Sequence, residues 1–403
     1  MKEGKGAVSK FWYAIIQIMV WGGFGLILCY CSNFMKSMDF ADSHVSIVLG
    51  TGTAVSVLAQ LLLAELIQRV KILTTAGTLV LQGAVLVAGG ILMFQNSHQI
   101  LAIVGICMGC VVVQTIPSLA NALATESDRM GQSVNYPIAR GLGSLAYSLI
   151  SFLAGQLIGK AGIVAIPLMT LLMGGVLCLA ALCFAHTSGP SRLEKVDRKS
   201  RTPEQDGAGR GFFKKYPGLV FFLMGSILLY TNHSFVSTFM QQIMSAKGAG
   251  AGQQGIAIAI SGLMELPAMF GFACLLKKAP CAKWLRISCI CFAIKAVLTL
   301  AAPNALWVYV AQIFQMGGFA TYQVGSVEYM GTVVEAEDAV RGQTYLATTL
   351  TVGSLIAFCV GGFICQYAGV SVMLTAAVAL ALLGSLLVFR STTINRSCMR
   401  QNS

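Results

Sequence analysis

The chain has 403 residues, of which 56% are hydrophobic and only 10% are charged, and its formal net charge at pH 7 is +12. Its mean hydropathy of +0.76 lies outside the usual range for water-soluble chains of this size, which excludes an ordinary soluble domain. The composition therefore indicates a protein that crosses a lipid bilayer several times.

A helix that crosses the hydrocarbon core needs about 20 largely apolar residues. Twelve segments of the sequence meet this requirement, so we expect an all-α membrane protein with twelve transmembrane helices. The predicted spans are 11–31, 44–66, 72–94, 99–125, 134–159, 163–186, 217–243, 252–276, 282–302, 305–333, 339–366 and 370–390.

The longest polar interruption, residues 186–217, is rich in charge, glycine and proline and lacks apolar periodicity. These properties predict a linker between two six-helix halves. The predicted domains are an N-terminal six-helix bundle (1–186), a cytoplasmic linker (187–216), a C-terminal six-helix bundle (217–390) and a cytoplasmic tail (391–403).

The two halves share a short similarity. The fifth span ends in "AGQLIGKAGI" and the eleventh in "GGFICQYAGV", and their Ala-Gly steps at Ala161–Gly162 and Ala368–Gly369 are about half a chain apart. A six-plus-six parallel repeat is typical of one large transporter superfamily, in which a pseudo-two-fold axis along the membrane normal relates the bundles. The substrate site of such a protein lies near the bilayer midplane.

Lysine and arginine are unevenly distributed over the loops. Twelve spans place only Lys36, Lys160 and Lys247 on one side, whereas both termini and the linker lie on the other, basic side. By the positive-inside rule, both termini and the linker are cytoplasmic in a multi-pass protein of the plasma or inner membrane. Since topology explains the basic excess, we expect the lipid bilayer but no nucleic acid as a partner.

No cofactor, metal site or enzymatic activity is expected. Most of the 13 cysteines fall inside apolar spans, where they act as small packing residues, and we interpret the "CMGC" motif at Cys107 and Cys110 in the same way. The sequence contains no H-E-x-x-H or P-loop pattern. Its Ser, His and Asp residues form no recognisable catalytic set.

Charged side chains inside spans are costly, at roughly 3 kcal/mol at the helix centre, and usually face a wet cavity or a partner. Arg140 in the fifth span, Glu265 in the eighth and Lys295 in the ninth are of this kind, and Glu328 lies near the end of the tenth. These residues are therefore the first candidates for a functional site.

Arg140 and Tyr147 are seven residues apart, so they share one face of the fifth helix. A planar guanidinium beside an aromatic ring suits an oxygen-rich or carboxylate ligand. The alternative is an arginine that extends to the membrane surface, because Arg140 lies near the expected cytoplasmic end of its span.

Glu265 lies in mid-span and is followed by Pro267, which frees a backbone carbonyl one turn earlier. A carboxyl in such a place can load and release a proton near neutral pH, as a proton-coupled carrier requires. The alternative for Glu265 is a structural salt bridge to Arg140 or Lys295. Lys295 either contributes to function or only compensates the charge of Glu265 or Glu328.

Further polar residues lie in the seventh and tenth spans. Each can form a simple interhelical hydrogen bond, and together they form a candidate cavity lining. His233 also titrates near neutral pH, although a structural role is common for a single histidine. The residues are Asn232, His233, Tyr322, Gln323 and Glu328.

These features resemble the major facilitator superfamily, and within it the oligosaccharide/proton symporters typified by lactose permease, with nucleoside permeases as relatives. The fifth-span motif "YPIARGLG" contains Arg140 and Gly143, and Tyr147 falls where the family has a stacking aromatic. The resemblance implies that Arg140 and Tyr147 bind the solute. Asn121 lies near the family's fourth-span acidic residue.

The same resemblance implies that Glu265 takes part in both solute binding and coupling, and it places Lys295 at a ninth-span arginine. The sequence departs from the family at three places, the first of which is Pro137 in place of a glycine in the fifth-span motif. The tenth-span histidine and glutamate fall on Gln315 and Gly318, and the loop "AELIQRVK" lacks the usual Gly and Asp. The resemblance therefore does not extend to galactoside specificity, and we expect Glu265, Glu328 or His233 to carry the proton.

The sequence thus predicts a secondary active transporter that works as a monomer and couples the uptake of a small polar solute to a proton. Sugars or oligosaccharides, nucleosides and aromatic carboxylates all suit the predicted solute-binding residues, which are Arg140, Tyr147, Glu265, Asn121, Asn232, Tyr322 and Gln323. Two alternatives remain open at this point: a drug or metabolite efflux carrier of the same fold, and a transport-incompetent sensor or receptor.

Overall fold

The computed structural model describes residues 2–70, 74–95, 99–129, 134–188 and 208–401, and in this part of the chain every regular element is helical. Residues 189–207 of the predicted linker lie outside the described residues. The chain divides into two compact units. The first unit is Met1–Asp197 with Gly250–Ala259, and the second is Arg198–Ala249 with Ile260–Ser403. The domain boundaries expected from the sequence stay a prediction.

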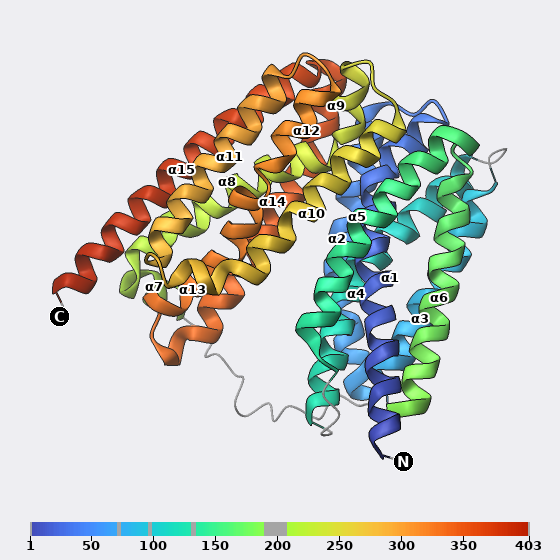
Figure 1. The fold of residues 1–403 in the computed structure, drawn as a ribbon, viewed down its shortest axis with the longest axis horizontal. Helices are drawn as coiled ribbons and strands as arrows, with labels where there is room; N and C mark the ends of the chain where they lie inside the picture. Colours follow the sequence, from blue (N-terminus) through green and yellow to red (C-terminus); the bar gives the residue numbers. More distant parts are fainter. Residues whose placement is uncertain (1, 71–73, 96–98, 130–133, 189–207, 402–403) are drawn as a thin grey trace. The chain divides into compact units, whose positions relative to one another are not determined.

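The first unit contains six long helices. In Figure 1, α1 packs against α4, α5 and α6, and α3 packs against α4 and α6. The helices are α1 (Lys2–Lys36), α2 (Asp42–Arg69), α3 (Thr75–Met93), α4 (Gln99–Arg129), α5 (Tyr136–Ala161) and α6 (Ala165–Ser188).

The beginning of α10 (Ala251–Leu276) also belongs to the first unit. The amide of Gln254 donates a hydrogen bond to the backbone oxygen of Cys29 at 2.9 Å and accepts one from Asn33 at 2.9 Å. Gln156 of α5 donates to the backbone oxygen of Gly252 at 3.0 Å. Polar side chains therefore attach this segment to α1 and α5.

The second unit is built on α8, which packs against α14 and α15, and on α11, which packs against α13 and α15. Besides the rest of α10, the elements of this unit are α7 (Ala208–Lys215), α8 (Pro217–Thr238), α9 (Met240–Ala246), α11 (Cys281–Ala301), α12 (Ala305–Ile313), η2 (Met316–Ala320), α13 (Thr321–Val333), η3 (Ala336–Asp338), α14 (Ala339–Tyr367) and α15 (Val370–Gln401).

Eleven helices of the described chain are long and apolar enough to cross a membrane. The tenth predicted span, 305–333, is present as three successive pieces, α12, the π-helix η2 and α13, each of which is too short to be counted alone. The predicted fold class, an all-α membrane protein with twelve spans in two six-helix bundles, is thus confirmed.

Each of the two similar Ala-Gly steps places a left-handed glycine at the end of a helix. Gly162 follows the end of α5 with φ +77°, and Gly369 follows the end of α14 with φ +89°. The N–H of Gly162 donates to the oxygen of Ile158, and that of Gly369 donates to Ile364, each at 3.0 Å. Glycine adopts this left-handed conformation without the steric cost of a Cβ atom, so the repeat in the sequence marks two helix ends that close on a glycine.

A group of ion pairs and hydrogen bonds joins the start of α8 to the turn before α14; we call its residues, Lys215, Tyr216, Glu335 and Asp338, the clasp. Lys215 Nζ lies 2.8 Å from Glu335 Oε2 and 3.1 Å from Asp338 Oδ2, and the hydroxyl of Tyr216 donates to Asp338 Oδ2 at 3.2 Å. The hydrogen bond from Lys215 lowers the pKa of Asp338 below its usual 3.8. The hydrogen bonds to Glu335, Tyr216 and Asp338 raise the pKa of Lys215. The clasp lies outside the membrane-spanning segments.

The clasp predicts a pH-dependent stability. Because the folded-state pKa of Asp338 is below its unfolded value, its contribution to stability is present above about pH 4 and is lost as the pH falls through the folded pKa. We expect Asp338→Asn to melt below the wild type near neutral pH and to match it in strong acid, as measured by thermal unfolding in detergent. The exposed neighbour Glu337 is the control, as Glu337→Gln. A difference for Asp338→Asn that does not change with pH would contradict the assignment.

The contact between α8 and α14 predicts a second stability effect. A Cβ atom at Gly353 would lie 2.9 Å from the backbone oxygen of Ile227 and 3.0 Å from the nitrogen of Thr231, whereas one at Gly331 would meet nothing within 4 Å. Since backbone atoms cannot move aside cheaply, we expect Gly353→Ala to destabilise the protein by about 1–3 kcal/mol. Gly331→Ala should be neutral or stabilising, because alanine favours helices. Equal melting temperatures of the two variants would show that α8 and α14 are not this close.

Candidate functional site

The second unit contains a buried polar bridge between a carboxylate and an amine. Lys295 on α11 is 5% exposed, and its Nζ donates to Gln315 Oε1 at 2.5 Å. The Nε2 of the same glutamine donates to Glu265 Oε1 on α10 at 2.9 Å. Glu265 also acts electrostatically on Lys295. We call these three residues the Glu265–Gln315–Lys295 bridge. The bridge joins Glu265 and Lys295, which were predicted from the sequence, through Gln315. From the sequence, Gln315 was indicated only as the residue that stands where the family has a histidine.

The broken tenth span positions Gln315 in this bridge. Gln315 directly precedes the π-helix η2, and its backbone oxygen accepts from Ala320, five residues on, at 3.1 Å. A Cβ atom at Gly317 would lie 2.7 Å from the Sγ of Cys291 on α11, one turn before Lys295. Because Gly317 has no side chain, α11 can pack closely against η2, and Gln315 lies within hydrogen-bond distance of the Lys295 amine. Single-turn π-helices of this kind are frequent at functional sites.

His233 on α8 lies beside the bridge. Its ring stacks on Phe319 of η2 with a centroid distance of 3.9 Å and an interplanar angle of 14°. Lys295 acts on it electrostatically, and its buried Nδ1 has no hydrogen-bond partner among the described residues. The structure therefore places His233 near the predicted proton site without joining it to the bridge by a hydrogen bond.

Four other predicted residues of this unit do not join the bridge. Asn232 is 3% exposed, and its amide donates to the backbone oxygen of Ala377 on α15 at 2.8 Å. Tyr322 is fully buried, and its hydroxyl lies 2.8 Å from Ser226 Oγ. Gln323 is half-buried and Glu328 is exposed. In this structure Asn232 and Tyr322 hold helices together, and a solute-binding role for them stays a prediction.

In the first unit, Arg140 lies against an aromatic ring. Its Cζ is 3.7 Å from the ring centroid of Trp21 on α1, and its Nη1 donates to Ser144 Oγ, one turn along α5, at 2.6 Å. Arg140 is half-buried. A guanidinium fixed on an indole face is a preorganised donor, because cation–π contact and hydrogen bond restrict its rotamers.

Trp21 belongs to a hydrogen-bonded row along α1. Its Nε1 donates to Gln17 Oε1 at 3.1 Å, Gln17 Nε2 donates to the Tyr13 hydroxyl at 2.7 Å, and this hydroxyl donates to the backbone oxygen of Ala120 at 3.1 Å. The row therefore fixes the indole that supports Arg140 and ties it to α4.

Two further predicted residues lie near these helices. The hydroxyl of Tyr147 is 3.3 Å from Cys29 Sγ on α1. Asn121 on α4 is exposed and directly follows Ala120, whose backbone oxygen accepts the hydrogen bond from the Tyr13 hydroxyl. The prediction that Arg140 and Tyr147 share one helix face agrees with the contacts of both residues with α1.

Trp21, Gln17 and Gln315 are not among the site residues predicted from the sequence. Tyr13, Gln17 and Trp21 follow one another at intervals of four residues, so they lie on one face of α1. This spacing could have predicted their hydrogen-bonded row from the sequence. For Gln315 the only signal was the resemblance, which places it at the tenth-span histidine of the family; the packing of α11 on the π-helix distinguishes it from the other glutamines of the apolar spans.

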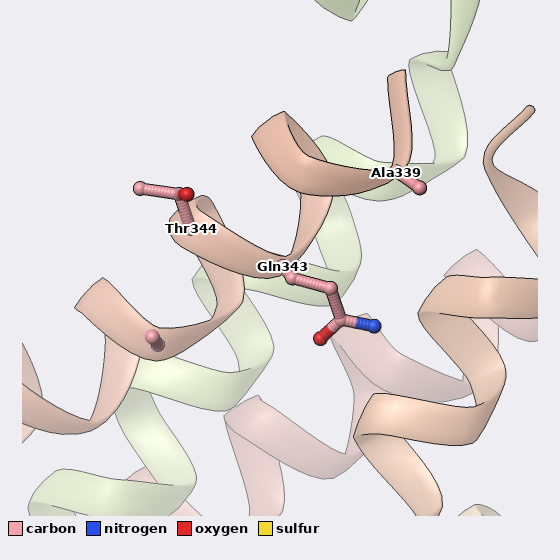
Figure 2. Close-up of a pocket in the computed structure, with 4 residues that line it drawn as sticks. Ala339, Gln343 and Thr344 are labelled. Atoms are coloured by element: carbon pink, nitrogen blue, oxygen red, sulfur yellow. The ribbon is translucent and has the colours of Figure 1, made fainter. Parts of the chain in front are cut away.

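A surface depression of about 520 Å³ lies at the start of α14 (Figure 2). Its lining residues, Ala339, Gln343, Thr344 and Ala347, all belong to that one helix. Gln343 already donates to the backbone oxygen of Val327 at 3.0 Å. A solute site brings polar groups together from several elements, so this depression is not the candidate site.

Many apolar helices with ionisable side chains buried among them define a polytopic membrane protein of the transporter type. Residues 11–376 match the MFS_1 like family, and the chain belongs to that family. Family and fold together make it a multi-pass membrane transporter. No curated protein matches the sequence.

Solved structures with the same fold are transporters of several kinds. A variant of the nucleoside transporter NupG aligns over 96% of this chain and 99% of its own, with a TM-score of 0.75 and 13% identity. A bacterial homologue of the iron transporter ferroportin aligns over 95% and 98%, with a TM-score of 0.72 and 12% identity. A variant of the peptide transporter POT aligns over 96% and 94%, with a TM-score of 0.69 and 12% identity. Similarity at this identity shows the fold alone.

The bridge predicts a defined pattern of stability changes. Gln315→Leu removes the acceptor of a buried ammonium, so we expect a loss of about 1–3 kcal/mol in the free energy of unfolding. Adding Lys295→Met should cost less than the sum of the two single changes, because no buried ammonium is then left without an acceptor, whereas Glu265 loses its counter-charge in the Lys295→Met single variant as well. Thermal unfolding of both single variants and the double variant measures the coupling. Additive effects of the two changes would contradict the bridge.

Proposed function

We propose that the chain is a secondary active transporter that couples the uptake of a small polar solute to a proton by alternating access. The solute is a sugar or oligosaccharide, a nucleoside or an aromatic carboxylate. The single observation that supports the proposal most strongly is the Glu265–Gln315–Lys295 bridge, because it holds one titratable carboxyl beside one buried amine.

The charge balance of the bridge gives a reason for coupling. With Glu265 ionised and Lys295 protonated, the pair is neutral. A proton on Glu265 leaves one positive charge in a region of low dielectric constant, which is unfavourable unless another group compensates it. An electron-rich or anionic solute group near Lys295 supplies that compensation. Proton and solute therefore favour each other's binding, and by linkage this preference is reciprocal.

Among the three predicted proton carriers, Glu265 has the environment that this mechanism needs. It is half-buried and hydrogen-bonded to the amide that also holds Lys295. Glu328 is exposed, and His233 stacks on Phe319 outside the hydrogen-bonded bridge. We therefore assign the transported proton to Glu265.

Arg140 and Tyr147 are proposed to bind the solute. The guanidinium lies over the ring of Trp21 and donates to Ser144, so this planar donor is held in one orientation. Such a fork suits pairs of hydroxyls or a carboxylate, and an aromatic side chain on the same helix face suits a sugar, nucleobase or aromatic ring. Asn121, Asn232, Tyr322 and Gln323 remain further candidates.

We propose that the transporter lies in the plasma or inner membrane as a monomer, with both termini in the cytoplasm, because the basic loops lie on the side of the termini.

Solute-driven proton uptake into proteoliposomes tests the function. A pH dye inside the vesicles reports acidification while oligosaccharides, nucleosides and aromatic acids are added in turn. We expect one class to acidify the wild-type vesicles and Glu265→Gln to lower this signal at least about tenfold while solute counterflow persists. Arg140→Ala should lose both acidification and counterflow, because it affects solute binding.

Glu328→Gln is the matched control, since it removes the same charge from an exposed position. It should retain acidification. No acidification by any solute, together with normal counterflow in Glu265→Gln, would refute proton coupling and favour a uniporter or exporter. Loss of acidification in Glu328→Gln but not in Glu265→Gln would refute the assignment of the proton.

A further inference from the structure

A cluster of basic side chains lies between α10 and α11. Lys277 and Lys278 directly follow the end of α10, and Lys283 and Arg286 lie in the first two turns of α11. The three lysines are exposed, and Arg286 is half-buried. We call these four residues the 277–286 basic patch.

The basic patch lies at the level of a membrane surface. One candidate span ends at Leu276 and the next begins at Cys281, so the four side chains flank the boundary of the apolar region. Trp284 lies among them, and its Nε1 donates to the backbone oxygen of Leu275 at 2.9 Å. Tryptophan is enriched at the headgroup level of bilayers.

The positive charges of the patch are not balanced by a carboxylate in the described part of the chain. In the described part of the chain, none of the four residues forms an ion pair with a carboxylate. Two acidic residues of the turn before α14, Glu335 and Asp338, form ion pairs with Lys215 and not with the patch. Exposed Glu328 acts electrostatically on Cys281, and no ion pair joins it to the patch in the described structure.

Arg286 has a fixed orientation. Its Nε donates to Thr392 Oγ1 at 2.9 Å, its Nη2 donates to Thr393 Oγ1 at 3.0 Å, and its Cζ lies 5.9 Å from the ring centroid of Phe389. These contacts come from α15, which packs against α11. A guanidinium held in this way loses little entropy when it binds an anion, and its planar fork matches a phosphate group.

We propose that the 277–286 basic patch binds the phosphate headgroup of an anionic phospholipid. The lysines would supply attraction and Arg286 the oriented donors. The ligand is a lipid because the patch lies at the boundary of two membrane spans, where headgroup phosphates are always present. Basic clusters next to membrane helices attract anionic lipids at about 1 kcal/mol per side chain, which corresponds to a factor of about five.

Fluorescence quenching of Trp284 by brominated lipids tests the proposal on the full chain. The protein is reconstituted into phosphatidylcholine vesicles with a minor fraction of phosphatidylglycerol, and bromine is placed on the tails of either phosphatidylglycerol or an equal fraction of phosphatidylcholine. The signal of Trp284 is the difference between wild type and Trp284→Phe. We expect the anionic lipid to quench it at least about fivefold more effectively.

A pair of triple variants separates this site from diffuse attraction. Lys277→Gln with Lys278→Gln and Lys283→Gln should bring the preference for the anionic lipid close to one. Lys10→Gln with Lys160→Gln and Lys247→Gln removes the same charge from other places and should leave the preference unchanged. Equal quenching of the wild type by both lipids would overturn the proposal, and so would an equal loss of preference in both triple variants.

Discussion

The buried ammonium of Lys295 is the constraint on which the second unit depends. An unpaired charge in a low-dielectric interior is costly, so the surrounding helices must supply an acceptor and a counter-charge. The amide oxygen of Gln315 is the acceptor, the carboxylate of Glu265 is the counter-charge, and the amide nitrogen of Gln315 donates to that carboxylate. This single side chain thereby fixes the relation of α10, α11 and the broken tenth span. The π-helix and Gly317 follow from the same requirement, since they bring Gln315 and α11 together.

The two units contain different kinds of charge. In the first, Arg140 remains charged at any physiological pH, and an indole, a hydroxyl and the row of Gln17 and Tyr13 fix its position. In the second, Glu265 is able to change its charge, and a neutral amide links it to a buried amine. A permanent, preorganised donor suits recognition of a solute, and a titratable carboxyl suits coupling. This division is the physical basis of the proposed symport.

Most of the fold followed from the sequence, because the length and apolarity of a span are local properties. The predicted tenth span, 305–333, has the same limits as the three pieces that the structure contains, yet its π-helix was not predictable. A five-residue change of helix type depends on the contact of Gly317 with Cys291, which is far away in sequence. Glu265 and Lys295 were found because charge is rare in apolar segments. Trp21 was not, since an indole is unremarkable there until its neighbours are known, and Gln315 was indicated only by the resemblance, as the residue at the family's tenth-span histidine.

The central claim is that Glu265 receives a proton when the solute binds. Infrared difference spectroscopy of the reconstituted protein, with and without the solute identified by proton flux, measures this directly through the C=O stretch of a protonated carboxyl group. The account predicts that solute binding produces this band in the wild type and that Glu265→Gln abolishes it while the solute still binds. A band that persists unchanged in Glu265→Gln would place the proton elsewhere, and no band in the wild type would contradict proton coupling through a carboxyl group.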